Sequence, residues 1–195
     1  MLIDFIKHLN WIDILLACVC ARAVFIGIKT GFIVEFFKSL GILFSIFITL
    51  HYYSTLTVVL ASQITSFELP TLAILVFWAL WFLMTYVFKL IREGLMMVFS
   101  VQAHPNVDRW GGAFLACLRG VVVSSMVFYA LLLTYNPDII KVAQNSLARN
   151  AVSYLPTGIY AGVFNGFVTK FFPQEKISEE ALAVPQLSEN KRARK

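Results

Sequence analysis

Residues 108–120 read DRWGGAFLACLRG and open an apolar run that continues to Tyr135. From Ala113 onward, Arg119 is the one charged residue in this run. At about 1.5 Å of rise per helical residue, the run is long enough to cross the roughly 30 Å hydrocarbon core of a bilayer. We therefore expect a transmembrane helix over residues 113–135.

Small residues recur at every fourth position in this stretch, as Gly112, Ala116 and Gly120. Four residues are close to one helical turn, so the three positions share one face and form a groove. The hydrophobic effect does not drive helices together in lipid, whereas a face of small residues allows close packing. The sequence predicts that a second helix lies in this groove.

Arg119 places a guanidinium beside the groove, inside the expected span. A charge at membrane depth costs roughly 2.5–3.5 kcal/mol on insertion scales. Two interpretations remain open. Either the side chain extends to the headgroups, or it pairs with an acidic residue on another helix.

The whole chain has the composition of an integral membrane protein. Of its 195 residues, 59% are hydrophobic and 14% are charged, against about 25% charged in ordinary globular proteins. The apolar residues also fall in long runs, which is typical of membrane spans. We expect an all-α integral membrane protein with four transmembrane helices and a C-terminal amphipathic or interfacial helical segment. The expected spans are residues 11–28, 32–50, 70–88 and 113–135.

A tight connection joins the first two expected spans. Gly27 and Gly31 lie four residues apart there, so the two helices can approach closely where the chain turns. In an antiparallel hairpin centred on this turn, Arg22 and Glu35 fall at nearly the same depth, and we predict that they pair. The alternative is that Glu35 lies at the membrane interface near Lys38 and is merely solvated.

The next connectors differ in charge. Residues 51–68 form an expected polar connector without Lys or Arg, whereas Lys89, Arg92 and Glu93 mark the exit of the third span. Between that exit and Asp108, residues 95–99 are apolar but too short to cross. We expect them to lie in the interface or to dip into the membrane and return.

The expected spans and connectors divide the chain into three segments. Residues 1–135 are the four-span membrane domain, and residues 136–172 are an amphipathic or re-entrant helical segment. Within the latter, residues 139–150 have one apolar and one polar face, suited to a membrane surface or a partner. Residues 151–169 are broken by proline and glycine, and are either re-entrant, interfacial or a fifth crossing. Residues 173–195 are polar and charged, and we expect them to be disordered.

The net charge of +5 indicates membrane orientation and not nucleic-acid binding. Juxtamembrane Lys and Arg favour the cytoplasmic side. The first and third connectors are basic and would therefore be cytoplasmic, which places both termini outside in a four-span protein. The basic residues 191–195 disagree with that placement, and a fifth crossing would resolve the conflict. The basic connector residues are Lys29, Lys38, Lys89, Arg92 and Arg109.

Three groups of residues resemble the colicin V production protein family of bacterial inner-membrane proteins. The N-terminal group is Trp11-Ile12-Asp13 followed by Gly31-Phe32 and Glu35, and an aromatic group is His51-Tyr52-Tyr53. The most specific group is Asp108-Arg109, Gly112, Arg119 and Gly120, which matches the family's D-R-x-x-G-x-x-x-x-x-x-R-G pattern. Ala116 departs from it where glycine is common, and the tail beyond Phe172 lies outside the resemblance.

The resemblance implies a small multi-pass bundle in the bacterial inner membrane. It also implies a requirement for production or export of the colicin V toxin and, more broadly, for envelope function. It implies no reaction. The candidate polar site residues are Asp13, Arg22, Glu35, Asp108, Arg109 and Arg119, and the candidate helix-packing residues are Gly27, Gly31, Gly112, Ala116 and Gly120.

Sequence motifs for catalysis are absent. The chain has no G-x-x-x-x-G-K-[ST], no dinucleotide fingerprint and no H-E-x-x-H, and its three histidines are isolated from one another. We expect no catalytic residue, metal or cofactor. The predicted function is non-enzymatic, through helix–helix assembly with other membrane proteins or a homo-oligomer in the lipid bilayer. The alternative is an oligomeric channel or transporter in which Arg22, Glu35 and Arg119 line the pathway.

Overall fold

The computed structural model describes residues 10–63, 68–98 and 105–188, and this part of the chain is helical, with no strand. Four helices are long and apolar enough to cross a membrane, which confirms the predicted fold class. They are α2 (Trp11–Thr30), α3 (Phe32–Ala61), α4 (Leu69–Val98) and α5 (Pro105–Leu133).

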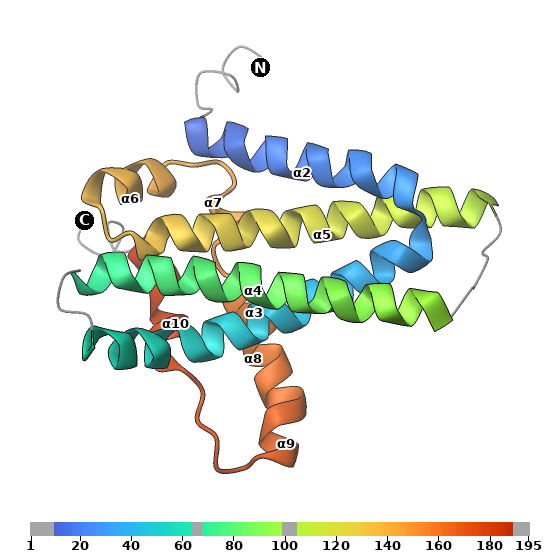
Figure 1. Cartoon of the computed structure of the whole chain (residues 1–195). Helices are drawn as coiled ribbons and strands as arrows, with labels where there is room; N and C mark the ends of the chain where they lie inside the picture. Colours follow the sequence, from blue (N-terminus) through green and yellow to red (C-terminus); the bar gives the residue numbers. More distant parts are fainter. Residues whose placement is uncertain (1–9, 64–67, 99–104, 189–195) are drawn as a thin grey trace.

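Helix α5 lies at the centre of the bundle, with α2 on one side and α3 and α4 on the other (Figure 1). In its most apolar 18 residues, 50% are buried, against 22% to 28% in the corresponding stretches of the other three helices. Aromatic rings fill the space around it, and Tyr129 of α5 stacks on Phe77 of α4 with ring centroids 5.6 Å apart. Tyr53 of α3 meets the same Phe77 edge-on at 6.0 Å.

The first two spans do not pack on each other as the antiparallel hairpin on which the pair of Arg22 with Glu35 depended. Helix α2 packs along α5 and has few contacts with α3, which packs instead on α4 and α5. The chain turns at Gly31, whose φ of +83° lies in the left-handed region that favours glycine. After this turn α3 runs back in the opposite direction but diverges from α2, and α5 lies between the two helices (Figure 1).

Two predicted connectors are helical over much of their length. Helix α3 continues to Ala61, and its buried face continues with it, because Tyr53 and Thr57 lie one turn apart on that face. The Thr57 hydroxyl donates to the Tyr53 carbonyl oxygen at 2.6 Å. Helix α4 likewise continues to Val98, so residues 95–98 are its last turn and not a re-entrant segment. Phe99 lies outside the described residues.

The region after α5 forms short helices and no further candidate span among the described residues. Helix α6 (Pro137–Gln144) covers the start of the amphipathic segment, and α7 (Arg149–Val152) follows it. Residues 151–169, for which a fifth crossing was one of the alternatives, belong mostly to a short helix interrupted by a π-helical turn. Its parts are α8 (Leu155–Val163), the π-helical turn (Phe164–Val168) and α9 (Thr169–Phe171).

The prediction of a disordered tail is wrong for residues 173–188. Helix α10 (Glu179–Ala183) and a 3-10 helix (Val184–Ser188) pack on the bundle, and Ala181 and Val184 are buried. The hydroxyl of Tyr129 donates to the Ala181 carbonyl oxygen at 3.1 Å. These contacts were hidden in the sequence because a few apolar residues stand among many polar ones. The basic residues 191–195 lie outside the described part of the chain.

Candidate functional site

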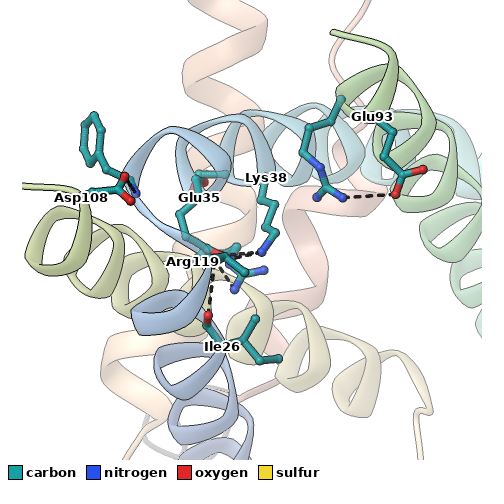
Figure 2. A network of polar contacts seen from close by, with 10 residues as sticks. Ile26, Glu35, Lys38, Glu93, Asp108 and Arg119 are labelled. Carbon is teal, nitrogen blue, oxygen red and sulfur yellow. Dashed lines mark hydrogen bonds and ion pairs between the residues drawn. The ribbon is translucent and has the colours of Figure 1, made fainter. Parts of the chain in front are cut away.

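Glu35 is the centre of a charged cluster where α2, α3 and α5 meet (Figure 2). Its side chain is fully buried in the first turn of α3. Lys38 Nζ lies 2.5 Å from Oε1, and Arg119 Nη2 lies 3.0 Å from Oε2. The Thr30 hydroxyl, at the end of α2, lies 2.5 Å from Oε1. One carboxylate therefore pairs with two cations from two helices and leaves an excess of one positive charge.

The turn at Gly31 creates this cluster. It ends α2 at Thr30 and starts α3 at Phe32, so the Thr30 hydroxyl and the Glu35 carboxylate face each other across the turn. Lys38 follows Glu35 at the i,i+3 spacing, which places both on one side of α3. Burying any of these charges alone would be costly, and the pairing with Glu35 offsets part of that cost.

The structure decides between the two interpretations of Arg119 in favour of pairing with an acid on another helix. The predicted pair of Arg22 with Glu35 is wrong, because α2 and α3 do not form a hairpin. Arg22 is exposed on the side of α2 that faces away from α5, and it has no ion-pair partner within the described residues. Arg109 is also exposed, in the first turns of α5, without a carboxylate partner in that part of the chain.

Asp108 is a capping residue for α3. Its Oδ1 accepts a hydrogen bond from the Phe32 backbone N–H at 2.7 Å, so a carboxylate from α5 satisfies a free donor at the start of α3. A Cβ on Gly31 would lie 2.3 Å from Asp108 Oδ2. Gly31 is thus required twice, for its positive φ and for the space that Asp108 occupies.

The small-residue groove of α5 holds α2. A Cβ on Gly27 would lie 2.0 Å from Ala116 Cβ, and a Cβ on Gly112 would lie 2.9 Å from the Gly27 carbonyl oxygen. A Cβ on Gly120 would lie 3.0 Å from Ala23 Cβ and 3.2 Å from Cys20 Cα, both on α2. The helix that lies in the groove therefore comes from the same chain.

Asp13 lies at the opposite end of the bundle and binds the segment between α6 and α7. Its carboxylate accepts hydrogen bonds from the Ser146 hydroxyl at 2.5 Å, from Ala148 N at 3.1 Å and from Leu147 N at 3.3 Å. It also accepts from Asn10 N at 3.0 Å. These contacts fasten the start of α2 to residues 146–148.

Several residues near the cluster were not chosen from the sequence as site residues. Lys38 was considered as a neighbour in the interfacial alternative, Lys89 and Arg92 as markers of the span's exit, and all three as basic connector residues that indicate orientation. A signal existed for Lys38 in its i,i+3 spacing from Glu35. Thr30 carried no signal, because its role depends on how α2 and α3 meet at the Gly31 turn. Among the described residues no three His, Cys, Asp or Glu side chains gather as metal ligands, and His8 and His104 lie outside that part.

Four membrane-length helices, two of them joined by a buried ion pair, define a multi-pass α-helical membrane protein. A family model described as Colicin V production protein matches residues 12–157, and the chain belongs to this family. The matched range contains the Gly31 turn, the Glu35 cluster and the groove of α5. Comparisons with curated proteins and with solved structures gave no match.

Proposed function

We propose that the protein is a non-enzymatic component of the bacterial inner membrane that supports toxin production and export, and envelope homeostasis, by associating with another membrane protein. Its membership of the colicin V production family and its four candidate spans support the setting. The observation that carries the proposed mode of action is the exposed Arg22 on α2.

Arg22 lies well inside the span. The close approach of Gly120 to Cys20 and Ala23 places Arg22 near the level of Arg119, which is compensated by Glu35. The neighbouring exposed side chains on α2 include Leu15 and Phe25, so the surface around this guanidinium is apolar. A helix that presents a carboxylate at this level would remove the cost of an unpaired charge.

The acidic residues of this chain favour a different protein over a second copy as that partner. Asp13, Glu35 and Asp108 lie in the spanning helices and are already engaged by donors of their own chain, and Glu93, near the end of α4, lies 3.7 Å from Arg92 of the same helix. A second copy therefore has none of these carboxylates free for Arg22. The predicted homo-oligomer would have to use another contact.

Photo-crosslinking in cells tests the proposal. A photoreactive amino acid replaces Phe25 on the Arg22 face of α2 or, as the matched control, Leu83 of α4, which is also apolar and exposed. We expect a protein adduct of defined mass from position 25, absent from position 83 and lost with Arg22→Leu. Loss of toxin secretion by the same variant, at unchanged protein level, would support the link to export. Equal adducts from both positions, or full secretion by Arg22→Leu, would contradict the proposal.

The alternative of an oligomeric channel or transporter draws on one observation, a cavity beside Arg119. Purified oligomer in proteoliposomes would then conduct or carry an anion, and Arg119→Gln would change the flux. Absence of flux from a demonstrated oligomer would count against this alternative.

A further inference from the structure

A cavity of about 590 Å³ opens beside the Glu35 cluster, between α3, α4 and α5 with one residue of α2. Its walls are largely apolar and include Phe37, Ile42, Phe82 and Phe88. The crossing of α3 and α4 closes one side, where a Cβ on Gly41 would lie 3.0 Å from Phe88 Cβ. Four basic side chains also line the cavity, and they are Lys38, Lys89, Arg92 and Arg119.

The charges of this cavity do not balance within the described residues. Two carboxylates face the four bases: Glu35, which pairs with Lys38 and Arg119, and Glu93, which lies 3.7 Å from Arg92 and 3.9 Å from Lys89. Four positive charges against two negative ones leave an excess of two. Glu93 is also half-exposed at the end of α4, so its compensation is weak.

Hydrogen-bond donors in the cavity lack acceptors. Arg119 Nε is buried without a hydrogen bond, whereas Nη2 of the same guanidinium faces Glu35 Oε2 at 3.0 Å. The Thr85 hydroxyl is likewise buried without a partner in the described part of the chain. Both side chains line the same cavity. Buried donors of this kind are normally satisfied, so their grouping indicates an absent acceptor.

We propose that the cavity binds the phosphate group of an anionic membrane lipid, with an acyl chain along its apolar walls. Phosphate oxygens accept strong hydrogen bonds from a guanidinium and from a hydroxyl, and they carry the charge that the cavity lacks. The basic residues lie at the end of the bundle with the Gly31 turn, which the positive-inside rule places in the cytoplasm. Basic pockets between spans on that side bind anionic headgroups.

The walls distinguish a lipid from a soluble phosphate. Phe82 and Tyr86 line the cavity and are themselves exposed, on the outer surface of α4. A water-soluble anion would leave this apolar lining uncovered, whereas the acyl chain of a lipid covers it. The proposal makes no use of the Arg22 face, so its failure leaves the proposed function untouched.

The experiment is a thermal-unfolding titration of the purified full chain in detergent micelles. Phosphatidylglycerol is compared with phosphatidylcholine of the same acyl chains, for the wild type, Arg92→Gln, Thr85→Val and the control Lys29→Gln. Lys29 is exposed at the same end of the bundle but does not line the cavity. Each variant is referred to its own midpoint without lipid, and Thr85→Val keeps every charge and nearly the same shape.

We expect phosphatidylglycerol to stabilise the wild type at a lower concentration than phosphatidylcholine. Arg92→Gln should raise the half-saturating phosphatidylglycerol concentration about fivefold, the loss of one cation near an anionic headgroup. Thr85→Val should raise it by a smaller factor, and Lys29→Gln should leave it unchanged. Glycerol 3-phosphate, the soluble headgroup, should not stabilise any form at millimolar concentration.

Three results would overturn the inference. Equal stabilisation by the two lipids would show that the cavity does not select an anion. Equal effects of Arg92→Gln and Lys29→Gln would show that net charge alone attracts the lipid. Stabilisation by glycerol 3-phosphate equal to that by phosphatidylglycerol would show that the cavity holds a free phosphate.

Discussion

The two ends of the bundle are held by different interactions. At the end with the Gly31 turn, a fully buried carboxylate, Glu35, holds two cations, and Asp108 caps α3. At the other end, the partners of the buried polar groups are mainly neutral, and even the Asp13 carboxylate accepts from a hydroxyl and backbone N–H groups and not from a cation. The hydroxyl of Tyr53 lies 3.3 Å from that of Tyr129, which donates to the tail, and His51 Nδ1 lies 2.9 Å from the Tyr160 hydroxyl.

This difference predicts which substitutions should lower the free energy of unfolding most. Removing one partner from a buried ion cluster leaves a charge without compensation, whereas removing one neutral hydroxyl leaves at most an unsatisfied polar atom. The turn end should therefore be the more sensitive of the two. Four substitutions test this ranking, and unfolding in mixed micelles measures each one.

The largest effect is expected for Glu35→Gln. Both Lys38 and Arg119 would lose their carboxylate inside the bundle, at a cost of about 3–5 kcal/mol in the free energy of unfolding. Glu93→Gln is the matched control, since Glu93 also faces two cations but is half-exposed, and it should cost under about 1 kcal/mol. Adding Arg119→Met to Glu35→Gln should recover part of the loss. Equal costs for the two glutamate variants would remove the distinction between the ends.

Gly31→Ala should give the second largest effect. The new Cβ would meet the Asp108 carboxylate at 2.3 Å, in a residue whose φ is +83°. We expect a loss of about 1–3 kcal/mol from backbone strain, together with displacement of the cap on α3. Gly158→Ala is the control, because a Cβ there meets nothing within 4 Å and α8 gains helix propensity. If both variants were equally stable, Gly31 would not be needed for the turn.

Tyr129→Phe tests the neutral end. It removes the donor to the Ala181 carbonyl oxygen and the contact with the Tyr53 hydroxyl while keeping the ring stacked on Phe77. We expect a loss of about 1 kcal/mol. Hydrogen exchange should show lower protection in residues 178–188, with the Glu35 end unchanged. A loss as large as that of Glu35→Gln would place the sensitive end of the bundle here instead.

The four spans could be predicted from the sequence because apolar runs of this length are typical of membrane helices and rare in water-soluble domains. The helix ends could not be predicted, because α3 continues past residue 50 with Tyr53 and Thr57 buried in the bundle, and their burial depends on the tertiary fold. The small-residue pattern of α5 indicated a close helix neighbour, and only the fold identifies it as α2.

Two members of the charged cluster, but not their pairing, could be identified from the sequence. Glu35 and Arg119 stood out as charges inside apolar runs, but their pairing depends on α3 crossing α5 after the Gly31 turn. The wrong pair of Arg22 with Glu35 followed from assuming a hairpin. Asp108 was marked by its motif, yet its role as a cap on Phe32 N joins residues far apart in the chain and has no local signal.

The smallest effect is expected for Lys141→Gln, which repeats the geometry of the Glu35 cluster without its burial. Lys141 lies 3.1 Å from Asp138 at the same i,i+3 spacing as Lys38 and Glu35, but the two side chains are 57% and 85% exposed. Water screens such a pair, so the loss should be under about 0.5 kcal/mol.

Lys38→Gln is its matched variant, because Glu35 keeps Arg119 and the turn keeps its shape. The difference between the two lysine variants then measures what burial, together with the 3.3 Å hydrogen bond from Lys38 Nζ to the Thr30 hydroxyl, adds to the same helical pair. If Lys141→Gln cost as much as Lys38→Gln, burial would not be the reason that the turn end is sensitive. The spacing of opposite charges along a helix would then explain both ends alike.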